Sequence, residues 1–473
     1  MTPFLKRWGL ALTIVVAITG AALTDRFAPA SPHLPATDPP ASPGGAWGCP
    51  FVKAAGSPGW IHLANFGDEA SRVRVTYIPD RREPVTQAFE LGAGRAGTIG
   101  TPPAIRGVGA GAIVEYAGGD VVVSRSAFLT ANGGTGGAAA SCARPGPQAV
   151  VVPEGSTLRV ETTLVLLNPG TSDAVVDVSL VFDGQELRPE SLRGRVVPAR
   201  GRLTIREGDF AFDEPAVAGV IRARSGRIVA DALLATSGLV DLVPAVGAQS
   251  ESVVVAHTAG GAIFTAVTVG DVDALADGRS LSRAGQGVFE PLAGGLPPNT
   301  PRVGGIPENS IPPGPIAVAA SSSTSPVALS ARWRVVGRGG VSDQAAGSGV
   351  PPALRTAAVV GPPASELRLL IANPAEQDAS VSVVVVTEAG RSTPAALQRV
   401  SVEAGSTVEL RLSDLGGSGS VGVLLRAVGA PVAAAIQAVA VRPSFGAYAI
   451  TAVPDLPRPP VGVDPDPRAG VPA

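Results

Sequence analysis

Residues 162–180 read TTLVLLNPGTSDAVVDVSL: an apolar run, a turn centred on Asn168, and a second run with apolar residues at alternate positions. That second run places Val176, Val178 and Leu180 on one side and polar residues on the other, the period of a strand with one face in a core. Asn-Pro-Gly is turn chemistry, because the Asn side chain can bond its own backbone and Pro fixes φ. The stretch predicts a pair of antiparallel strands.

The same pattern recurs along the chain. Residues 60–77 (WIHLANFGDEASRVRVTY) carry Asn65, and residues 366–384 (ELRLLIANPAEQDASVSVV) carry Asn373. Asn65 and Asn168 are 103 positions apart, and Asn168 and Asn373 are 205 apart, nearly twice that interval. A fixed interval of this kind is the signature of a tandem repeat.

The doubled interval predicts a degenerate copy near residue 270. Residues 262–274 read AIFTAVTVGDVDA, with Gly270 where Asn is expected. A second marker, a turn followed by an apolar strand of small residues, keeps the same spacing near the end of each unit. It begins at Gly118, Ser225, Ser323 and Val428.

Each unit of about a hundred residues holds six or seven short strands, which is typical of an antiparallel sandwich and too long for a propeller blade. The sequence therefore predicts an all-β protein of four tandem immunoglobulin-like antiparallel β-sandwich modules. Their expected bounds are 46–146, 147–248, 249–350 (degenerate) and 351–452, followed by a disordered tail over 453–473.

The N-terminus is typical of an export signal. Lys6 and Arg7 precede an apolar run over residues 8–23, which is short for a membrane-spanning helix. We expect a signal anchor or signal peptide over 1–26; the anchor is favoured, and a cleaved signal stays open. A Pro-rich spacer is expected over 27–45. The chain would then be a single-pass membrane protein with an extracellular C-terminal region, or a secreted protein if the signal is cleaved.

Two cysteines, Cys49 and Cys142, lie outside the apolar segment. An even number of cysteines in an exported chain favours a disulfide over free thiols or metal ligation. A structural zinc site would need histidine, and the chain holds only His33, His62 and His257. We predict a Cys49–Cys142 bridge that staples the ends of the first module.

Composition excludes some partners. The formal net charge is −2, so the chain has no electrostatic footprint for nucleic acid. Gly92, Gly94 and Gly97 spell G-x-G-x-x-G, but Pro102 and Pro103 follow where a dinucleotide site needs a helix. That motif is interpreted as a turn.

Other candidate sites are equally weak. Asp271, Asp273 and Asp277 resemble a calcium loop, but Leu275 takes a ligand position and no Glu closes the loop. His62 is interpreted as a half-buried strand histidine rather than a catalytic base. The carboxylates Asp213, Glu214 and Asp241 have no spacing that selects them for hydrolysis, and Trp47, Trp60 and Trp333 suit core packing better than a sugar platform.

With the repeats laid out, the chain resembles a family of exported proteins from G+C-rich Gram-positive bacteria that is known only as a domain of unknown function. The resemblance covers residues 47–442, and the first repeat departs from it by placing Phe66 after Asn65. It rests on Trp47, Cys49 and Pro50, the turns of the Leu-Ala-Asn-Pro type, and residues 155–157, 168–184 and 225–231. The resemblance implies an envelope location and a link to cell-wall or polysaccharide biology, with no catalytic residues to carry over.

Together these patterns predict a non-enzymatic structural or interaction protein of the cell envelope, tethered to the membrane by its N-terminal segment. Its partner would be an envelope protein or a cell-wall polymer, and no cofactor, metal or catalytic residue is expected. A carbohydrate- or peptidoglycan-binding protein is the alternative, and an envelope hydrolase is a weaker one.

Overall fold

The structure is a computed structural model. The predicted signal segment 1–26, nearly all of the spacer 27–45 and the tail beyond residue 454 lie outside the residues that it describes. Contacts divide the chain after Ser42, and the account below concerns Pro43–Ala473. The described residues are 44–131, 134–146, 149–236, 240–257, 261–269, 272–292, 294–307, 314–336, 342–361, 366–412, 419–440 and 446–454.

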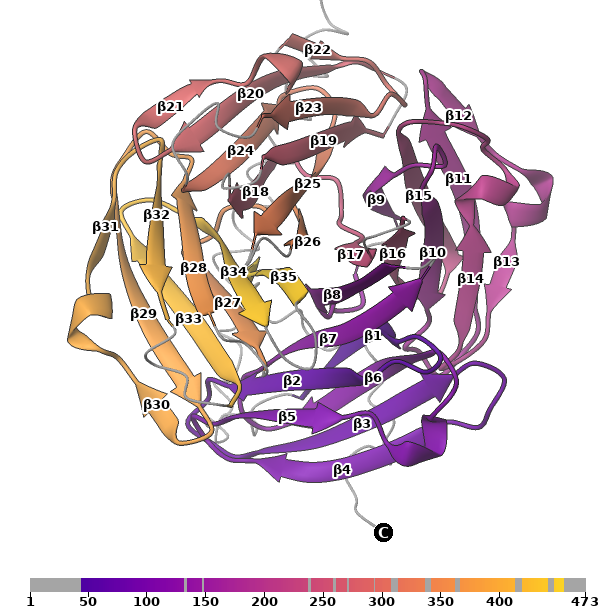
Figure 1. The fold of residues 1–473 in the computed structure, drawn as a ribbon, viewed down its shortest axis with the longest axis horizontal. Helices are drawn as coiled ribbons and strands as arrows, with labels where there is room; N and C mark the ends of the chain where they lie inside the picture. The colour runs from indigo at the N-terminus through magenta and orange to yellow at the C-terminus, as the bar shows by residue number, and fades with distance from the viewer. Residues whose placement is uncertain are drawn as a thin grey trace, which may run out of the picture. The chain divides into compact units, whose positions relative to one another are not determined.

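These residues fold into strands and short 3-10 helices, and the strands form four consecutive modules of two antiparallel sheets each (Figure 1). No helix among them is long and apolar enough to cross a membrane. The predicted all-β architecture of tandem sandwiches is confirmed.

Module 1 sets the pattern for the others. Its elements are β1 (Gly45–Lys53), β2 (Gly59–Asn65), β3 (Ser71–Pro79), β4 (Val85–Leu91), β5 (Ala96–Gly100), η1 (Pro103–Ile105), β6 (Ala110–Ala117), β7 (Val121–Ala131) and β8 (Gly134–Ser141). The first sheet has the order β1-β6-β3-β4 and the second sheet the order β5-β2-β7-β8.

Module 2 repeats this order. Its elements are β9 (Ala149–Gly155), β10 (Glu161–Leu167), β11 (Ala174–Phe182), β12 (Gln185–Leu187), η2 (Glu190–Leu192), β13 (Arg195–Val197), β14 (Arg202–Arg206), η3 (Glu207–Asp209), β15 (Val217–Ser225), β16 (Val229–Ala235) and β17 (Val240–Pro244). The first sheet is β12-β11-β15-β9, with β13 also on β11, and the second is β14-β10-β16-β17.

Module 3, the degenerate repeat, keeps the same arrangement. Its elements are β18 (Glu251–His257), β19 (Ala262–Thr268), β20 (Ala274–Ser282), β21 (Gly285–Val288), η4 (Glu290–Leu292), β22 (Gly294–Leu296), β23 (Arg302–Ile306), β24 (Pro315–Ser322), β25 (Val327–Val336) and β26 (Ser342–Ser348). The first sheet is β18-β24-β20, with β21 and β22 on β20, and the second is β23-β19-β25-β26.

Module 4 completes the series. Its elements are β27 (Arg355–Val360), β28 (Glu366–Asn373), β29 (Ala379–Thr387), β30 (Gly390–Ser392), η6 (Ala395–Leu397), β31 (Val400–Val402), β32 (Ser406–Arg411), β33 (Val421–Val428), β34 (Ala433–Ala440), β35 (Gly446–Thr451) and β36 (Val453–Pro454). The first sheet is β30-β29-β33-β27-β36, with β31 on β29, and the second is β32-β28-β34-β35. A parallel bridge from Ser282 to Ser406 joins this second sheet to the first sheet of module 3.

The central pairings are those of an immunoglobulin sandwich. There the second strand pairs with the fifth and the third with the sixth, as β2 pairs with β5 and β3 with β6 in module 1. The flanking strands are exchanged, because β1 pairs with β6 and β7 pairs with β2. An eighth strand, β8, then extends the second sheet at β7.

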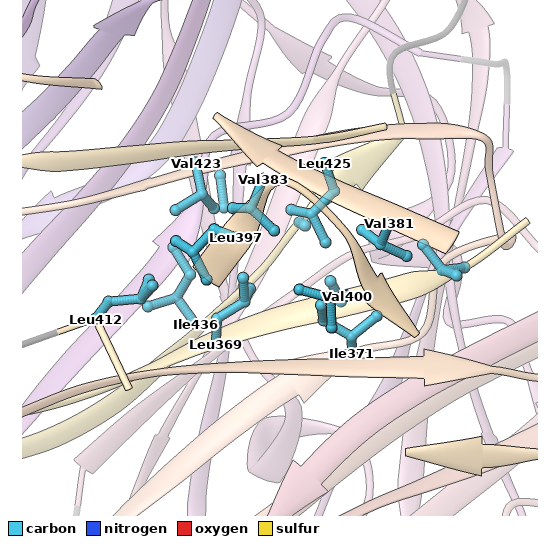
Figure 2. Packing of buried hydrophobic residues seen from close by; sticks show 14 of the residues in the cluster. Leu369, Ile371, Val381, Val383, Leu397, Val400, Leu412, Val423, Leu425 and Ile436 are labelled. Atoms are coloured by element: carbon cyan, nitrogen blue, oxygen red, sulfur yellow. The ribbon is translucent and has the colours of Figure 1, made fainter. Parts of the chain in front are cut away.

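Each module has its own apolar core between its two sheets. In module 4, Leu369 and Ile371 of β28 pack with Val381 and Val383 of β29 and with Leu425 of β33 (Figure 2). Along β29 the buried valines alternate with more exposed residues, as the period of two in the sequence predicts.

In modules 1, 2 and 4 the recurring turn is held by its Asn side chain. Asn168 is fully buried, and its Oδ1 accepts the backbone N–H of Gly170 at 2.9 Å. Its Nδ2 donates to the carbonyl of Ser172 at 2.8 Å and to that of Val197 at 3.0 Å. The amide therefore closes its own turn, as predicted, and also ties that turn to strand β13.

Asn65 and Asn373 hold their turns in the same way. In module 3 the equivalent residue is Thr268, whose Oγ1 donates to the carbonyl of Pro297 at 3.0 Å. Pro297 lies 29 positions after Thr268, which is the same interval as from Asn168 to Val197 on β13. The expectation that Gly270 takes this position is wrong by two residues. Gly270 itself lies outside the described residues.

Candidate functional site

Neighbouring modules pack in one recurring way: the second sheet of a module lies on the first sheet of the module before it. Leu167 and Val229 of module 2 pack on Ile78 and Ile113 of module 1. Between modules 3 and 2, Val267 and Ala328 pack on Val151 and Val220. Between modules 4 and 3, Leu370 and Ala433 pack on Val253 and Ala317. Between modules 1 and 4, Ala64 and Phe66 pack on Val359 and Leu424. The last of these joins module 1 to module 4, so the contacts form a closed circuit.

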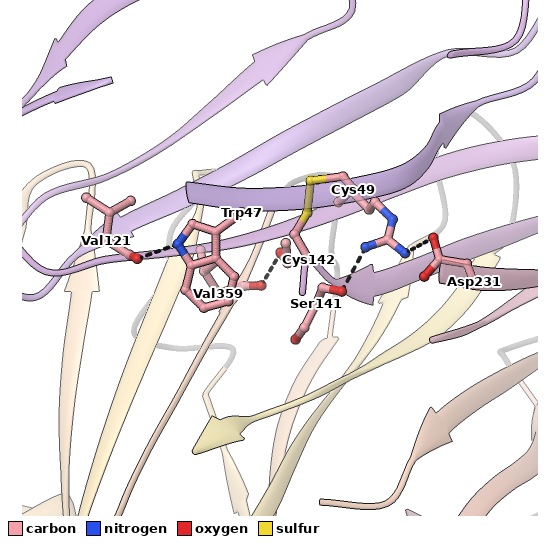
Figure 3. Close-up of a disulfide and its surroundings, with 9 residues drawn as sticks. Trp47, Cys49, Val121, Ser141, Cys142, Asp231 and Val359 are labelled. Carbon is pink, nitrogen blue, oxygen red and sulfur yellow. Dashed lines mark hydrogen bonds and ion pairs between the residues drawn. A yellow bond between two sulfur atoms is a disulfide. The ribbon is translucent and has the colours of Figure 1, made fainter. Parts of the chain in front are cut away.

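The interface between modules 1 and 2 contains a buried ion pair. Arg125 of β7 and Asp231 of β16 are 1% and 2% exposed, and Arg125 Nη2 pairs with Asp231 Oδ2 (Figure 3). Arg125 Nη1 also donates to the carbonyl of Ser141 at 2.7 Å. A buried charge that loses its partner is costly, so this pair fixes how the two modules meet.

A disulfide lies beside this ion pair. Cys49 and Cys142 are bonded, with Cα atoms 4.7 Å apart, which confirms the predicted pairing (Figure 3). Cys49 lies within β1. The bridge thus joins β1 of the first sheet to the residue that follows β8 of the second.

The interface between modules 1 and 4 encloses His62. The imidazole is fully buried, with Nδ1 2.9 Å from Thr98 Oγ1 and Nε2 2.7 Å from Ser126 Oγ. A Cβ atom at Gly361 of module 4 would lie only 1.8 Å from its Nδ1, so the histidine fills the space between the modules. Burial lowers the pKa of His62 to about 3, which keeps it neutral, and the geometry favours a structural role.

Modules 3 and 4 meet through a charged group around His257. Arg368 Nη1 donates to His257 Nε2 at 3.1 Å, and Glu409 lies 3.6 Å from the same nitrogen. Arg283 and Arg368 both pair with Glu409, at 3.0 and 3.4 Å. Burial, and then the charge of Arg368, lower the pKa of His257.

Modules 2 and 3 meet at a buried acidic group. Glu154 pairs with Arg332 across the interface, and burial nevertheless raises the pKa of Glu154. Asp241 is also buried, and burial together with the nearby charges of Asp343 and Glu154 raises its pKa well above the ordinary range. Asp343 in turn accepts the backbone N–H of Gly137 in module 1 at 2.8 Å.

The last strands of the second sheets connect all four modules through hydroxyl groups. Ser141 Oγ of β8 donates to the carbonyl of Thr451 on β35 at 2.7 Å. Thr451 Oγ1 donates to the carbonyl of Ser348 on β26 at 3.2 Å. Ser348 Oγ in turn donates to the carbonyl of Pro244 on β17 at 2.6 Å. Within the described residues, the modules therefore form one interlocked body.

The three tryptophans among the described residues are not arranged as a sugar platform. Trp47 is buried and donates from Nε1 to the carbonyl of Val121 at 2.9 Å. Trp333 is buried and donates to Gln437 of module 4 at 3.0 Å. Trp60 is half-buried, edge-on to Phe128. The core-packing interpretation of these residues is the one that their geometry supports.

The remaining motifs are not brought together. Gly92 and Gly94 of the G-x-G-x-x-G stretch lie in the turn from β4 to β5, where Gly94 has φ +59°, and Gly97 lies in β5. Asp277 pairs with Arg279, and Asp271 lies outside the described residues. Among the described residues, no three His, Cys, Asp or Glu side chains are grouped so that they could hold a metal ion.

The acidic pair of residues 213 and 214 lies apart from any such group. Asp213 is exposed with φ +54°, and the backbone of Glu214 bonds Thr157. Asp241 is buried beside Asp343 rather than open to a substrate.

Sequence reasoning missed the residues that join the modules. A signal was present, because Arg125, Asp231 and Glu154 are single charges inside otherwise apolar runs (VVVSRSAF, VADALLA and VVVPEG). A lone charge in a buried strand needs a partner, but the partners lie 106 and 178 positions away. Spacing alone could not identify them.

Fold and interfaces together define a class: a protein of tandem β-sandwiches interlocked by buried polar contacts. The chain belongs to the family DUF5719, described as a family of unknown function, whose model matches residues 115–369 and 355–453. No curated protein matches the chain.

Several solved structures match the chain, and two illustrate the range. One is the crystal structure of Thermotoga maritima 1070, with 14% identity and a TM-score of 0.20, over 22% of this chain and 96% of that one. The other is a tetra-tandem repeat in the extending region of a large adhesion protein, with 12% identity and a TM-score of 0.10, over 87% and 99%. Neither score supports an argument about fold or function.

Proposed function

We propose that this protein is a non-enzymatic scaffold of the cell envelope that holds its four β-sandwich modules as one body outside the membrane. The observation that carries the proposal is the run of hydroxyl bonds from Ser141 through Thr451 and Ser348 to Pro244. A chain of independent binding modules would not need such contacts, whereas a scaffold that fixes the spacing of its surface loops would.

Two further features support the envelope location. A disulfide persists in oxidising compartments, and Cys49 and Cys142 form one. The apolar N-terminal run after Lys6 and Arg7 would export and tether the chain. The partner would be another envelope protein or a cell-wall polymer, bound by exposed loops.

The alternatives have less support. A carbohydrate- or peptidoglycan-binding protein would be expected to display aromatic rings, yet Trp47 and Trp333 are buried. A hydrolase would need paired carboxylates beside a substrate, and Asp241 is buried within the interface between modules.

The proposal is tested by crosslinking in living cells. A photoreactive amino acid is placed at Phe212, which is 74% exposed, or at Val428, which is 73% exposed, and the captured partners are identified after membrane fractionation. Recovery of an envelope protein or wall polymer, together with an oxidised Cys49–Cys142 pair, supports the proposal. Recovery of cytoplasmic partners alone, with both thiols reduced, overturns it.

A further inference from the structure

A pocket of about 320 Å³ lies on the second sheet of module 3, on the face that the other modules use for packing. Its volume is at the lower end of the range for small-molecule sites. The residues that line it include Ile263, Gly305, Ile306, Arg332, Arg334 and Gln344. Ile263 and Arg332 are direct cross-strand partners on β19 and β25, so their side chains share this face.

Beside the pocket, module 3 has a polar pair of residues where module 4 has an apolar pair. In module 4 the corresponding positions are Leu370 and Ala435, which lie in an apolar cluster with module 3. Module 3 places Thr265 and Ser330 there. Thr265 and Ser330 are buried, whereas Ile263, two positions earlier on β19, lines the pocket and is 41% exposed.

The charge of the pocket is positive. Arg332 is 18% exposed and pairs with the buried Glu154, but a guanidinium has five N–H donors and one carboxylate does not use them all. Arg334 is exposed, and the described residues provide its side chain with no ion pair. Among the described residues, no Asp or Glu lines the pocket.

We propose that this pocket binds a small amphipathic anion: a carboxylate or phosphate held by Arg334 and Arg332, on a short apolar chain that packs on Ile263 and Ile306. Arginine matches both headgroups with paired N–H donors. The apolar walls bind the chain by removing it from water. This ligand class goes beyond the scaffold role proposed above and does not depend on it.

Calorimetric titration of the full chain in lipid nanodiscs tests the proposal, with empty nanodiscs subtracted. Octanoate and octyl phosphate are the probes, and the stronger binder identifies the headgroup. We expect saturable binding of at least one of them at one site per chain. Acetate lacks the apolar chain and octanol lacks the charge, so each should bind at least tenfold more weakly than the better anion.

Variants separate the pocket from the rest of the surface. Arg334→Gln should weaken binding of the better anion about tenfold, and Arg334→Lys should keep more of it. Ile263→Asn should weaken it as well. The matched controls are Arg227→Gln, an exposed arginine of module 2, and Leu275→Asn, an exposed leucine on β20; both should bind as the unaltered chain does.

The proposal is overturned if neither anion binds saturably. It is also overturned if octanol binds as tightly as the anions, or if Arg334→Gln and Arg227→Gln have the same effect. Arg332 is left unaltered throughout, because its removal would strand the buried Glu154 and disturb the interface.

Discussion

Glu207 in module 2 occupies the position that Leu412 occupies in module 4. Glu207 directly follows β14, and Leu412 directly follows β32. These two strands are equivalent, because their last residues, Arg206 and Arg411, pair with equivalent residues of β10 and β28. Both side chains are fully buried. One module therefore has a carboxyl group where another has an apolar core residue.

The residues around Glu207 are also smaller than those around Leu412. Gly155 and Gly219 are equivalent to Val360 and Val423 of module 4, because they pair with equivalent residues of the neighbouring strands. A Cβ atom at Gly155 would lie 2.5 Å from Glu207 Oε2, and one at Gly219 would lie 3.4 Å from Oε1. The two glycines make the space that the carboxyl group fills.

The first prediction concerns pH. Burial raises the pKa of Glu207 from 4.5 to about 8. Between these values the folded chain keeps a proton that the unfolded chain has released, so the free energy of unfolding falls as pH rises through that window. We expect Glu207→Gln to remove this loss, which amounts to up to about 5 kcal/mol because one pKa unit corresponds to about 1.4 kcal/mol.

Thermal unfolding from pH 4 to pH 9 measures this pH-dependent loss of stability. The melting temperature of Glu207→Gln should gain on that of the unaltered chain as pH rises, whereas Glu190→Gln, at an exposed glutamate, should follow the unaltered chain. Parallel curves for all three chains would contradict the prediction.

The second prediction has the opposite sign. Neutral His257 accepts a hydrogen bond from Arg368, and protonation would place a cation beside Arg368 and Arg283, only partly offset by Glu409 and Glu366. Because burial and Arg368 lower the pKa of His257, its contribution to stability is present above the ordinary value near 6.5 and is lost as pH falls below it.

Hydrogen exchange at pH 7.5 and pH 5 checks this point. Strands β18 and β32 should exchange faster at the lower pH in the unaltered chain, and His257→Asn should reduce the difference. An equal pH response in both chains would show that another group is responsible.

The third prediction concerns the buried ion pair. Asp231→Asn leaves Arg125 without a counter-charge in a buried site, so the free energy of unfolding should fall by about 3–5 kcal/mol. Glu161→Gln breaks the exposed pair with Arg206, whose side chains are 44% and 68% exposed, and should cost less than about 1 kcal/mol. Urea denaturation of both variants gives the comparison; equal costs would refute the assignment.

The fourth prediction concerns the disulfide. Cys49 and Cys142 are 93 positions apart, and closing a loop of that length stabilises the fold by roughly 4–5 kcal/mol on the chain-entropy account. The double variant Cys49→Ser/Cys142→Ser should show a fall of that order in urea denaturation. Addition of a reductant should lower the stability of the unaltered chain and leave the variant unchanged; a response in both would mean that the reductant acts elsewhere.

Much of the fold follows from local pattern. The turn at Asn168 and the alternation after it are properties of neighbouring residues, so the strands and the repeat interval could be predicted. The error at Gly270 has a physical reason, because Thr268 supplies only the hydroxyl bond to Pro297 and the local sequence has drifted.

The interfaces could not be predicted in the same way. Arg125 and Asp231 meet across 106 positions, and Ser124 and Val359 across 235. Nothing in the repeat specifies whether modules string out or close on one another, since both arrangements preserve the core of each module. The pocket beside Arg332 gathers residues from four strands of module 3, and their spacing in the sequence did not indicate it.

The contact between the first and last modules also constrains how the chain matures. Synthesis runs from the N-terminus, so the sheet of module 1 that carries Ala64 and Phe66 is complete at Ser141, roughly 220 residues before Val359 and roughly 280 before Leu424 arrive to cover it. During that interval an apolar sheet face is open to self-association. A chaperone or a delivery channel that shields the growing chain would therefore matter more here than for a string of separate sandwiches.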